Sequence, residues 1–307
     1  MSGQTSNGIV YLNGKYLPVE QANVNVLDRG FIFGDGIYEV LPAYDSKPFR
    51  VADHLARMGR SLEGVMIANP LTPAQWEAVF HQLIEANGGG DLSIYIQISR
   101  GVAKRDHVFP ANVTPTVLVV CTPLAPPPAA WRETGMKCAL REDIRWQRCD
   151  IKSISLLGNL LMRHQATLEG ANETILVRDG FLTEGSSSNV FVVKNGKAAT
   201  PPKNNLILSG ITREVTVELA PTLGIPCEER AVSQQELLSA DEIWVASSFR
   251  EVAPVCWLDG KKVGNGLPGP LWKKIWDGFQ AYKRGQAALA GIQLGAGGSA
   301  QAGAPHP

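Results

Sequence analysis

A run of prolines near the middle of the chain places the strongest constraint on its fold. Residues 123–128 read P-L-A-P-P-P. Proline has no backbone N–H and a fixed φ, so such a run cannot lie in the interior of a helix or a sheet. The run predicts a linker over residues 123–131, which separates an N-terminal domain of residues 1–122 from a C-terminal domain of residues 132–285. A chain of 307 residues is long enough for two domains that each bury a core.

Strand and helix patterns alternate on the N-terminal side of this linker. Asn13-Gly14 is typical of a hairpin turn, here between strands at 9–12 and 16–17. The strict alternation of L-S-I-Y-I-Q-I-S at 92–99 predicts a half-buried strand, and T-V-L-V-V-C at 116–121 predicts a fully buried one. Helices are expected at 53–65 and 73–87, the second ending at a run of glycines.

The C-terminal side mixes strands and helices in the same way. A strand is expected near 137–144, and turn sequences predict hairpins at 178–180, 195–196 and 259–260. Helices are expected at 158–169 and at 269–283, and a third begins after Ser209-Gly210 and runs to Leu223. Residues 286–307 are rich in Gly, Ala and Ser with little to bury, which predicts a disordered tail. The expected fold class is therefore α+β, with two domains.

The charge and cysteine content exclude several classes of function. Lys and Arg number 29 and Asp and Glu number 29, so the chain lacks the positive charge expected of a nucleic-acid or anionic-membrane binder. The five cysteines are odd in number with no C-x-x-C pair, which argues against a disulfide framework and a zinc site. No signal sequence or membrane span is recognisable. A cytoplasmic protein that binds a small molecule is expected.

Lys152 has a setting that an ordinary surface lysine does not explain. It lies in D-I-K-S-I-S-L-L-G-N-L, residues 150–160, among isoleucines and leucines. An ammonium is costly to remove from water, so one interpretation is a side chain that reaches from a strand end to solvent. The other is a buried amine that loses its proton readily and acts as a nucleophile. The residue alone leaves both interpretations open.

Two blocks rich in glycine and acidic residues stand on either side of this lysine. They read D-R-G-F-I-F-G-D-G-I-Y-E-V at 28–40 and T-E-G-S-S-S-N-V-F at 183–191. Each alone could be a turn before a strand, and neither is a phosphate loop of the G-x-x-x-x-G-K-[ST] or G-x-G-x-x-G type. Two further blocks accompany them, R-G-V-A-K-R-D-H-V-F-P at 100–110 and D-I-R-W-Q-R-C-D-I-K-S-I-S-L-L-G at 143–158.

In this order the four blocks resemble the fold-type-IV pyridoxal-phosphate enzymes, the class IV aminotransferases. The resemblance extends from about Gly8 to Lys283 and is closest to the D-amino-acid transaminases. It implies a two-domain α+β fold with mixed sheets, and pyridoxal 5'-phosphate as the cofactor. Members of the family resemble one another in being homodimers whose domains frame the cofactor, so a homodimer is expected.

The resemblance gives Lys152 a chemical role as the residue that forms a Schiff base with the cofactor. A neutral amine is needed for that bond, and once displaced it can carry a proton between the substrate α-carbon and the cofactor. By the family pattern Glu184 lies beside the ring nitrogen, where a carboxylate keeps that nitrogen protonated. Leu208 would pack against the ring. The other cofactor contacts implied, mostly to the phosphate, are Arg57, Ser188, Ile211, Thr212, Ser247 and Ser248.

The same resemblance implies D-amino acids as substrates, with D-alanine and 2-oxoglutarate as the default pair. Arg105 and His107 match an R-x-H signature that binds the α-carboxylate together with Tyr38. An arginine fork with a histidine and a phenol is chemically suited to a carboxylate.

The predicted side-chain pocket, lined by Val40, Pro42 and Phe249, departs from the family pattern. Phe249-Arg250 stands where D-enzymes carry small hydroxylated residues. Arg250 therefore either pairs with the distal carboxylate of an acidic substrate or lies at the surface beside Glu251.

Alternatives remain inside and outside this fold. A branched-chain L-amino acid transaminase and an R-selective amine transaminase are disfavoured by Arg105 and His107. An aminodeoxychorismate lyase is disfavoured by the block at 183–191, although the fold alone permits elimination. A binding module without catalysis is the alternative from another class.

Overall fold

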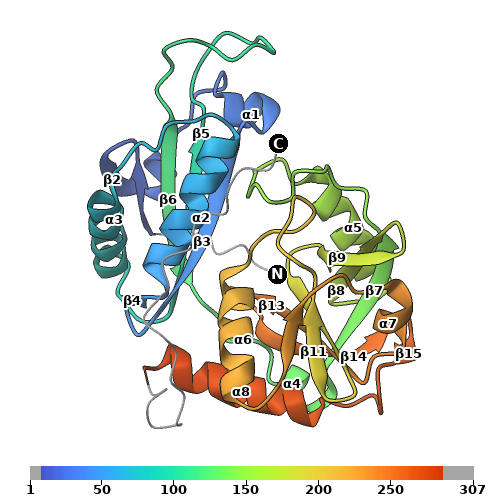
Figure 1. Cartoon of the computed structure of the whole chain (residues 1–307). Coiled ribbons are helices and arrows are strands. Elements are labelled where there is room, and N and C mark those ends of the chain that lie inside the picture. Colours follow the sequence, from blue (N-terminus) through green and yellow to red (C-terminus); the bar gives the residue numbers. More distant parts are fainter. Residues whose placement is uncertain (1–7, 286–307) are drawn as a thin grey trace.

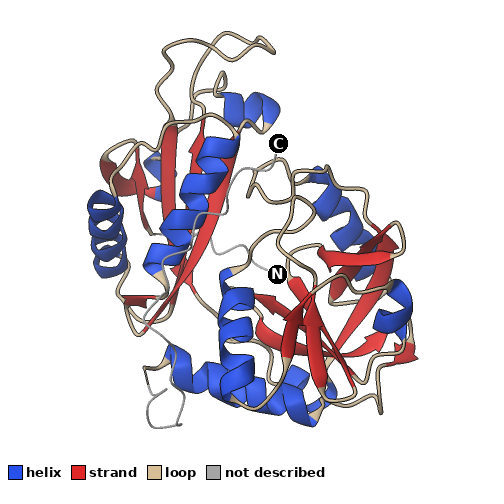
Figure 2. Cartoon of the chain, viewed as in Figure 1, coloured by secondary structure: helices blue, strands red, loops and turns tan. Residues whose placement is uncertain are grey.

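The computed structural model describes residues 8–285, so the tail predicted to be disordered lies outside the described residues. Two sheets form separate halves of the molecule, the first coloured blue to green and the second green to orange in Figure 1. Helices pack against both sheets, as Figure 2 shows. This arrangement agrees with the α+β class expected from the sequence.

The first sheet has six strands in the order β2-β1-β6-β5-β3-β4, and all neighbours are antiparallel. Asn13 and Gly14 join β1 to β2 with φ of 48° and 86°, the left-handed conformation that an Asn-Gly hairpin turn requires. The strands are β1 (Ile9–Leu12), β2 (Lys15–Pro18), β3 (Gly36–Tyr44), β4 (Lys47–Pro48), β5 (Leu92–Ser99) and β6 (Thr116–Pro123).

One face of the first sheet packs on α2 (Val51–Gly64) and α3 (Pro73–Ala86). In β6, Val117 and Val119 are buried on this face, whereas Leu118 and Val120 are half-buried on the other. The prediction of a fully buried strand at 116–121 was therefore wrong. The second apolar face of β6 lies on the side of the sheet that carries Tyr38, and within residues 8–285 no helix of this half packs against it.

The second sheet has nine strands in the order β12-β11-β10-β13-β14-β7-β8-β9, with β15 paired to β14. Three pairs are parallel: β7 with β8, β7 with β14, and β11 with β12. The strands are β7 (Met136–Glu142), β8 (Glu173–Arg178), β9 (Phe181–Gly185), β10 (Asn189–Lys194), β11 (Lys197–Thr200), β12 (Cys227–Glu229), β13 (Glu242–Ser247), β14 (Glu251–Leu258) and β15 (Lys261–Lys262).

Both faces of the second sheet are buried, because alternate residues of its strands join two different cores. In β10, Val190 and Val192 pack among residues of the sheet itself and α7 (Gln234–Leu238). Phe191 and Val193 point the other way, toward α6 (Ile211–Thr222) and α8 (Pro270–Lys283). α5 (Leu157–Leu168) packs on β8. This double burial explains the near-continuous apolar runs in these strands.

Most predicted elements are confirmed, with boundaries that differ by a few residues. The structure adds the short helices α1 (Arg29–Phe33), α4 (Ala130–Thr134) and α7, and a 3-10 turn at Val19–Gln21. Helices of one turn do not repeat an apolar face, so periodicity cannot reveal them. β6 ends at Pro123 and α4 begins at Ala130, which leaves 124–129 without helix or strand.

The two halves meet through backbone contacts beside Lys152. The amide of Tyr38 in β3 donates to the carbonyl oxygen of Lys152 at 2.9 Å, and Ile37 pairs with Ser153 as an isolated bridge. Arg57 of α2 donates through Nη1 to the carbonyl oxygen of Ser209 at 3.0 Å. Of the helices within residues 8–285, none combines the length and the apolar character needed to span a bilayer.

Candidate active site

A cavity of about 180 Å³ lies where the two halves meet. Tyr38, Val40 and Arg57 line it from the first half, and the second half supplies the other walls. Phe249, predicted to contact the substrate, also lines this cavity. So do all residues predicted to contact the cofactor, namely Arg57, Lys152, Glu184, Ser188, Leu208, Ile211, Thr212, Ser247 and Ser248. The structure thus brings these residues to one space, while their individual roles remain predictions.

Lys152 lies in the irregular segment between β7 and α5, where its backbone is held from both sides. Its amide donates to Ser61 Oγ at 3.1 Å, and its carbonyl oxygen accepts from Tyr38. The side-chain Nζ lies 4.2 Å from the centroid of the Tyr38 ring. The lysine is half-buried and faces the cavity, so the interpretation of a side chain reaching away to bulk solvent is not supported.

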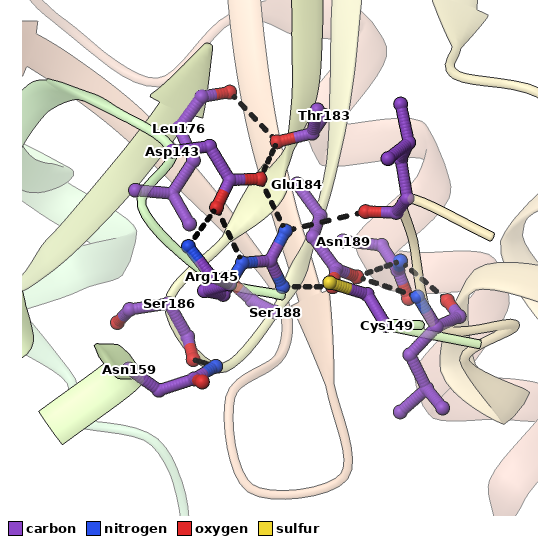
Figure 3. A network of polar contacts seen from close by, with 12 residues as sticks. Asp143, Arg145, Cys149, Asn159, Leu176, Thr183, Glu184, Ser186, Ser188 and Asn189 are labelled. Atoms are coloured by element: carbon purple, nitrogen blue, oxygen red, sulfur yellow. Dashed lines mark hydrogen bonds and ion pairs between the residues drawn. The ribbon is translucent and has the colours of Figure 1, made fainter. Parts of the chain in front are cut away.

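Glu184, near the end of β9, lies in the cavity wall, and its carboxylate is buried in a hydrogen-bond network (Figure 3). Oε1 accepts from Arg145 Nη1. Oε2 accepts from Asn189 Nδ2 at 3.1 Å and from the backbone amide of Leu208 at 3.0 Å. Burial raises the pKa of Glu184, although the Arg145 guanidinium works in the opposite direction. The carboxylate is therefore rigidly placed and accepts a proton more readily than an exposed glutamate does.

Arg145 is held in turn by Asp143, the residue at the far side of the same network (Figure 3). Arg145 donates to Asp143 through Nε at 2.9 Å and through Nη2 at 2.8 Å. Thr183 Oγ1 donates to the same carboxylate at 2.9 Å. Burial alone would raise the pKa of Asp143, but Arg145 outweighs it and holds this pKa below its ordinary value. Asp143 thus fixes the arginine that faces Glu184.

Asp143→Asn is expected to lower the free energy of unfolding by about 3 kcal/mol at pH 7, because the buried guanidinium of Arg145 loses one of its two charged partners and keeps only Glu184. The folded state binds fewer protons at this site than the unfolded state, so the stabilisation by Asp143 is complete above about pH 4 and is lost on acidification. The difference between wild type and variant should therefore shrink below that pH, by up to about 1.4 kcal/mol per pH unit. Urea unfolding between pH 3 and pH 7 measures it.

The control is Asp277→Asn, which breaks the exposed pair between Asp277 and Lys273 on α8. Exposed pairs contribute about 0.5 kcal/mol, so this variant should stay close to wild type at every pH. Equal losses for the two variants, or a difference for Asp143→Asn that does not change with pH, would contradict the assignment.

The cavity wall also gathers groups that suit an anion. α6 begins there, at the N-cap Gly210, with no side chain capping its first amides. A Cβ at Gly210 would lie 2.0 Å from Asn189 Oδ1, so glycine is needed to bring the helix start this close. The hydroxyls of Ser247 and Ser248 and the guanidinium of Arg57 line the same cavity.

Arg57 is oriented by a buried carboxylate on the helix-covered face of the first sheet. Glu39 accepts from Arg57 Nε at 3.0 Å and from Nη2, and its Oε1 lies 3.1 Å from His54 Nδ1. Burial opposes ionisation of Glu39, yet Arg57 and His54 hold the pKa of Glu39 well below its usual range. The charged carboxylate therefore fixes the direction of the arginine fork.

Arg105 and His107 do not line the cavity of their own chain. Both are exposed on the loop between β5 and β6, with the Arg105 guanidinium 5.3 Å and the His107 ring 5.7 Å from the centroid of the Phe33 ring. The loop is anchored by Arg29 Nη1, which donates to the carbonyl oxygen of Asp106 at 2.6 Å. The prediction that these two residues join Tyr38 in one site is therefore not met within a single chain. A local match to a signature does not fix where the fold carries a loop relative to the other residues of a site.

Arg250 takes neither of the two positions considered from the sequence. Its guanidinium contacts Ser187 and Glu173, and it is not among the residues that line the cavity. Glu251, the proposed surface partner, is buried and pairs instead with Lys283 of α8. The surface interpretation was wrong, because the strand turns Glu251 to the opposite side.

Some residues of the cavity wall escaped the sequence analysis. Arg145, Trp146, Ser187 and Asn189 lie inside the quoted blocks, and Asn159 directly follows one of them. Asn159 Nδ2 donates to the carbonyl oxygen of Ser186 at 2.8 Å, which fixes the start of the serine-rich turn. Position in a matching block was the available signal, but partners such as Arg145 and Glu184, 39 residues apart, are joined only by the fold.

The chain and its fold are similar to those of several known proteins. D-alanine aminotransferase of Bacillus licheniformis is 38% identical over 88% of this chain and 95% of its own length. The enzyme of the same name from Staphylococcus haemolyticus is 40% identical over 89% and 97%. A solved branched-chain amino acid aminotransferase of Escherichia coli superposes with a TM-score of 0.87 at 27% identity, over 91% of this chain and 96% of that one. The model of the family "Amino-transferase class IV" matches residues 36–257, and the chain accordingly belongs to the class IV aminotransferases.

Proposed function

We propose that this protein is a pyridoxal-phosphate-dependent D-amino-acid transaminase, which exchanges the amino group between D-amino acids and 2-oxo acids. The observation that carries the proposal is the cavity where an amine, a buried carboxylate and an anion-binding end face one space. Identities of 38% and 40% to D-alanine aminotransferases over nearly their whole length support D-alanine as the default substrate, with 2-oxoglutarate as the default acceptor.

The cavity fits pyridoxal 5'-phosphate because its three chemical requirements are met at separate places. The aldehyde needs the amine of Lys152, the ring nitrogen needs the carboxylate of Glu184, and the phosphate needs the donors at the start of α6. Leu208 and Ser188 line the same cavity. When bound, the cofactor supplies an electron sink for the negative charge that develops at the substrate α-carbon.

The protein's own groups move and hold the protons of the reaction. With the cofactor bound, Lys152 Nζ would take the proton from the substrate α-carbon as a general base and would return a proton as a general acid. Glu184 holds a proton at the ring nitrogen, and the hydrogen bonds from Arg145, Asn189 and Leu208 keep its carboxylate in place. The Tyr38 ring beside Nζ limits the directions that the amine can take.

A homodimer would complete the site, because Arg105 and His107 cannot serve the cavity of their own chain. The loop that bears them is rimmed by exposed apolar side chains, with Val108 74% and Phe109 45% exposed. Near the cavity, α5 exposes Leu157 and Leu160 to 70% and 60%. Exposed apolar surface of this kind marks an interaction site. We therefore propose that each copy inserts its loop beside the cavity of the partner, where the two residues bind the α-carboxylate of a D-amino acid.

The proposed location of the enzyme is the cytoplasm. All five cysteines are free in the structure, and four of them are buried. Unpaired cysteines accord with a reducing compartment.

The deciding experiment is a panel of D- and L-amino acids with 2-oxoglutarate, scored for 2-oxo acid formation. D-alanine should be preferred to L-alanine, and the purified protein should absorb visible light where the cofactor does. Preference for L-leucine would instead favour a branched-chain transaminase, the activity printed for the Escherichia coli structure that superposes on this chain. A protein without any visible absorbance would be a binding module.

Arg105→Ala is expected to lower kcat/KM for D-alanine roughly fifty-fold, since a substrate carboxylate loses charged hydrogen bonds of about 2–3 kcal/mol. Steady-state kinetics with D-alanine and 2-oxoglutarate measure the effect. Unchanged kinetics would remove Arg105 from the site.

Mixing two weak variants tests whether Arg105 serves the partner's site. Chains carrying Lys152→Ala and chains carrying Arg105→Ala, co-expressed with different tags, form mixed dimers with one intact site if the loop crosses between copies. Statistical pairing should then restore about a quarter of wild-type activity. If Arg105 serves its own chain, no mixed dimer has an intact site, and activity stays at or below that of Arg105→Ala.

A further inference from the structure

A fully buried carboxylate, Glu173 at the start of β8, lies behind the cavity wall. Its oxygens accept from three consecutive hydroxyls of the serine loop, residues 186–188. Ser187 and Ser188 donate at 2.9 and 3.1 Å, and Ser186 donates to the other oxygen. All three serines line the cavity. One carboxylate therefore sets the conformation of a whole loop of the site.

Arg250 supplies the positive charge that this carboxylate requires. Its Nη1 lies 3.1 Å from Glu173 Oε2 and donates to Ser187 Oγ at 3.0 Å. The other nearby guanidinium, of Arg163, is 4.0 Å away, and its Nη1 has no hydrogen-bond partner in the described part of the chain. A buried carboxylate without a close cation is strongly unfavourable, so Arg250 is its principal partner.

Arg250 also belongs to the second loop of the site, the turn between β13 and β14. Its backbone amide donates to Ser247 Oγ at 3.2 Å, and the preceding residues Ser248 and Phe249 line the cavity. The arginine thus joins the wall formed by the serine loop to the wall that carries the predicted phosphate-binding serines. Because Ser187 donates its hydroxyl hydrogen to Glu173, the Ser187 oxygen is free to accept from Arg250.

We infer that Arg250 is a positioning residue, which fixes the two loops of the cofactor pocket relative to one another through Glu173 and Ser187. This inference rests on the proposed use of the cavity for pyridoxal phosphate. It differs from a role in choosing acidic substrates, because Nη1 is engaged by Glu173 and Ser187 behind the wall. Loss of Arg250 should therefore affect all substrates alike.

The test uses the full-length holoenzyme with Arg250→Ala, Arg250→Lys, Glu173→Gln and the double variant Glu173→Gln/Arg250→Ala. Arg250→Ala should raise the dissociation constant of pyridoxal 5'-phosphate about tenfold, measured from visible absorbance on dilution. It should lower kcat/KM about tenfold for both D-alanine and D-glutamate, with the ratio between them unchanged. Arg250→Lys should retain much of the affinity. The double variant should bind the cofactor better than Arg250→Ala, because no unpaired carboxylate remains.

Arg230→Ala is the matched control, an arginine paired with Glu236 at the surface, and it should change none of these values. A selective loss with D-glutamate would overturn the inference in favour of a substrate contact. A lower melting temperature with unchanged cofactor affinity would show a merely structural arginine. If Arg250→Ala does not fold, the double variant takes its place, and a cofactor affinity of the double variant equal to that of wild type overturns the inference equally. Cofactor binding is read without any amino acid, so its outcome stands apart from failure of the D-specific function.

Discussion

Lys152→Ala is expected to abolish transamination, with kcat lowered by at least about 10⁴-fold, because one amine both binds the cofactor and moves the proton. The fold should survive, since the contacts that hold this segment to Tyr38 and Ser61 use the backbone of Lys152. Kinetics with D-alanine and 2-oxoglutarate measure the loss. Some cofactor should still bind through the groups at the start of α6, so visible absorbance should weaken and shift rather than vanish.

Borohydride reduction of the wild type, followed by peptide mapping, locates the bond directly. The pyridoxyl group should be found on Lys152. Lys203 is a suitable control, because it is paired with Glu214 outside the cavity, and Lys203→Ala should remain fully active. A pyridoxyl group on Lys203 or on Lys137 would contradict the assignment of Lys152 as the residue that binds the cofactor.

Glu184→Gln is expected to lower kcat by about 10²–10³-fold, because a neutral amide cannot hold a proton on the ring nitrogen as a carboxylate does. Gln has the same shape and can still accept from the amide of Leu208, so the dissociation constant of the cofactor should change by less than about tenfold. Arg145 keeps Asp143 as its partner, which limits the loss of stability.

Single-turnover measurements with D-alanine separate the chemical step from binding for this variant. Glu169→Gln is the control, since Glu169 pairs with Arg141 at the surface, and its kinetics should equal those of wild type. If Glu184→Gln weakens cofactor binding strongly and leaves the chemical step unchanged, the carboxylate serves as an anchor rather than as a proton partner.

The parts of the site that lie within one contiguous stretch of sequence could be predicted. Lys152 and Glu184 lie in blocks that resemble the family pattern, the start of α6 follows a local helix signal, and all three line the cavity. The hairpins were predictable for the same reason, because turn chemistry such as Asn13-Gly14 acts over neighbouring residues.

Features that depend on distant partners could not be predicted in this way. The charge of Arg250 was visible, but its partner Glu173 lies 77 residues earlier and is brought close only by the sheet. Arg105 and His107 matched their signature, yet the fold points their loop away from the cavity of the same chain. The apolar pattern of β6 likewise gave the strand but not the neighbour of its second face.

The cavity takes its walls from both halves of the chain, with Tyr38 and Arg57 on one side and Lys152 and Glu184 on the other. A molecule held there bridges the halves, so its binding free energy opposes their separation. That contribution grows by about 1.4 kcal/mol for each tenfold rise of free ligand above its dissociation constant. When the cofactor is scarce, the two halves would separate more readily, and the chain would be cleaved more easily by proteases. The concentration of the cofactor in the cell would therefore set the lifetime of the protein as well as the fraction of it that is active.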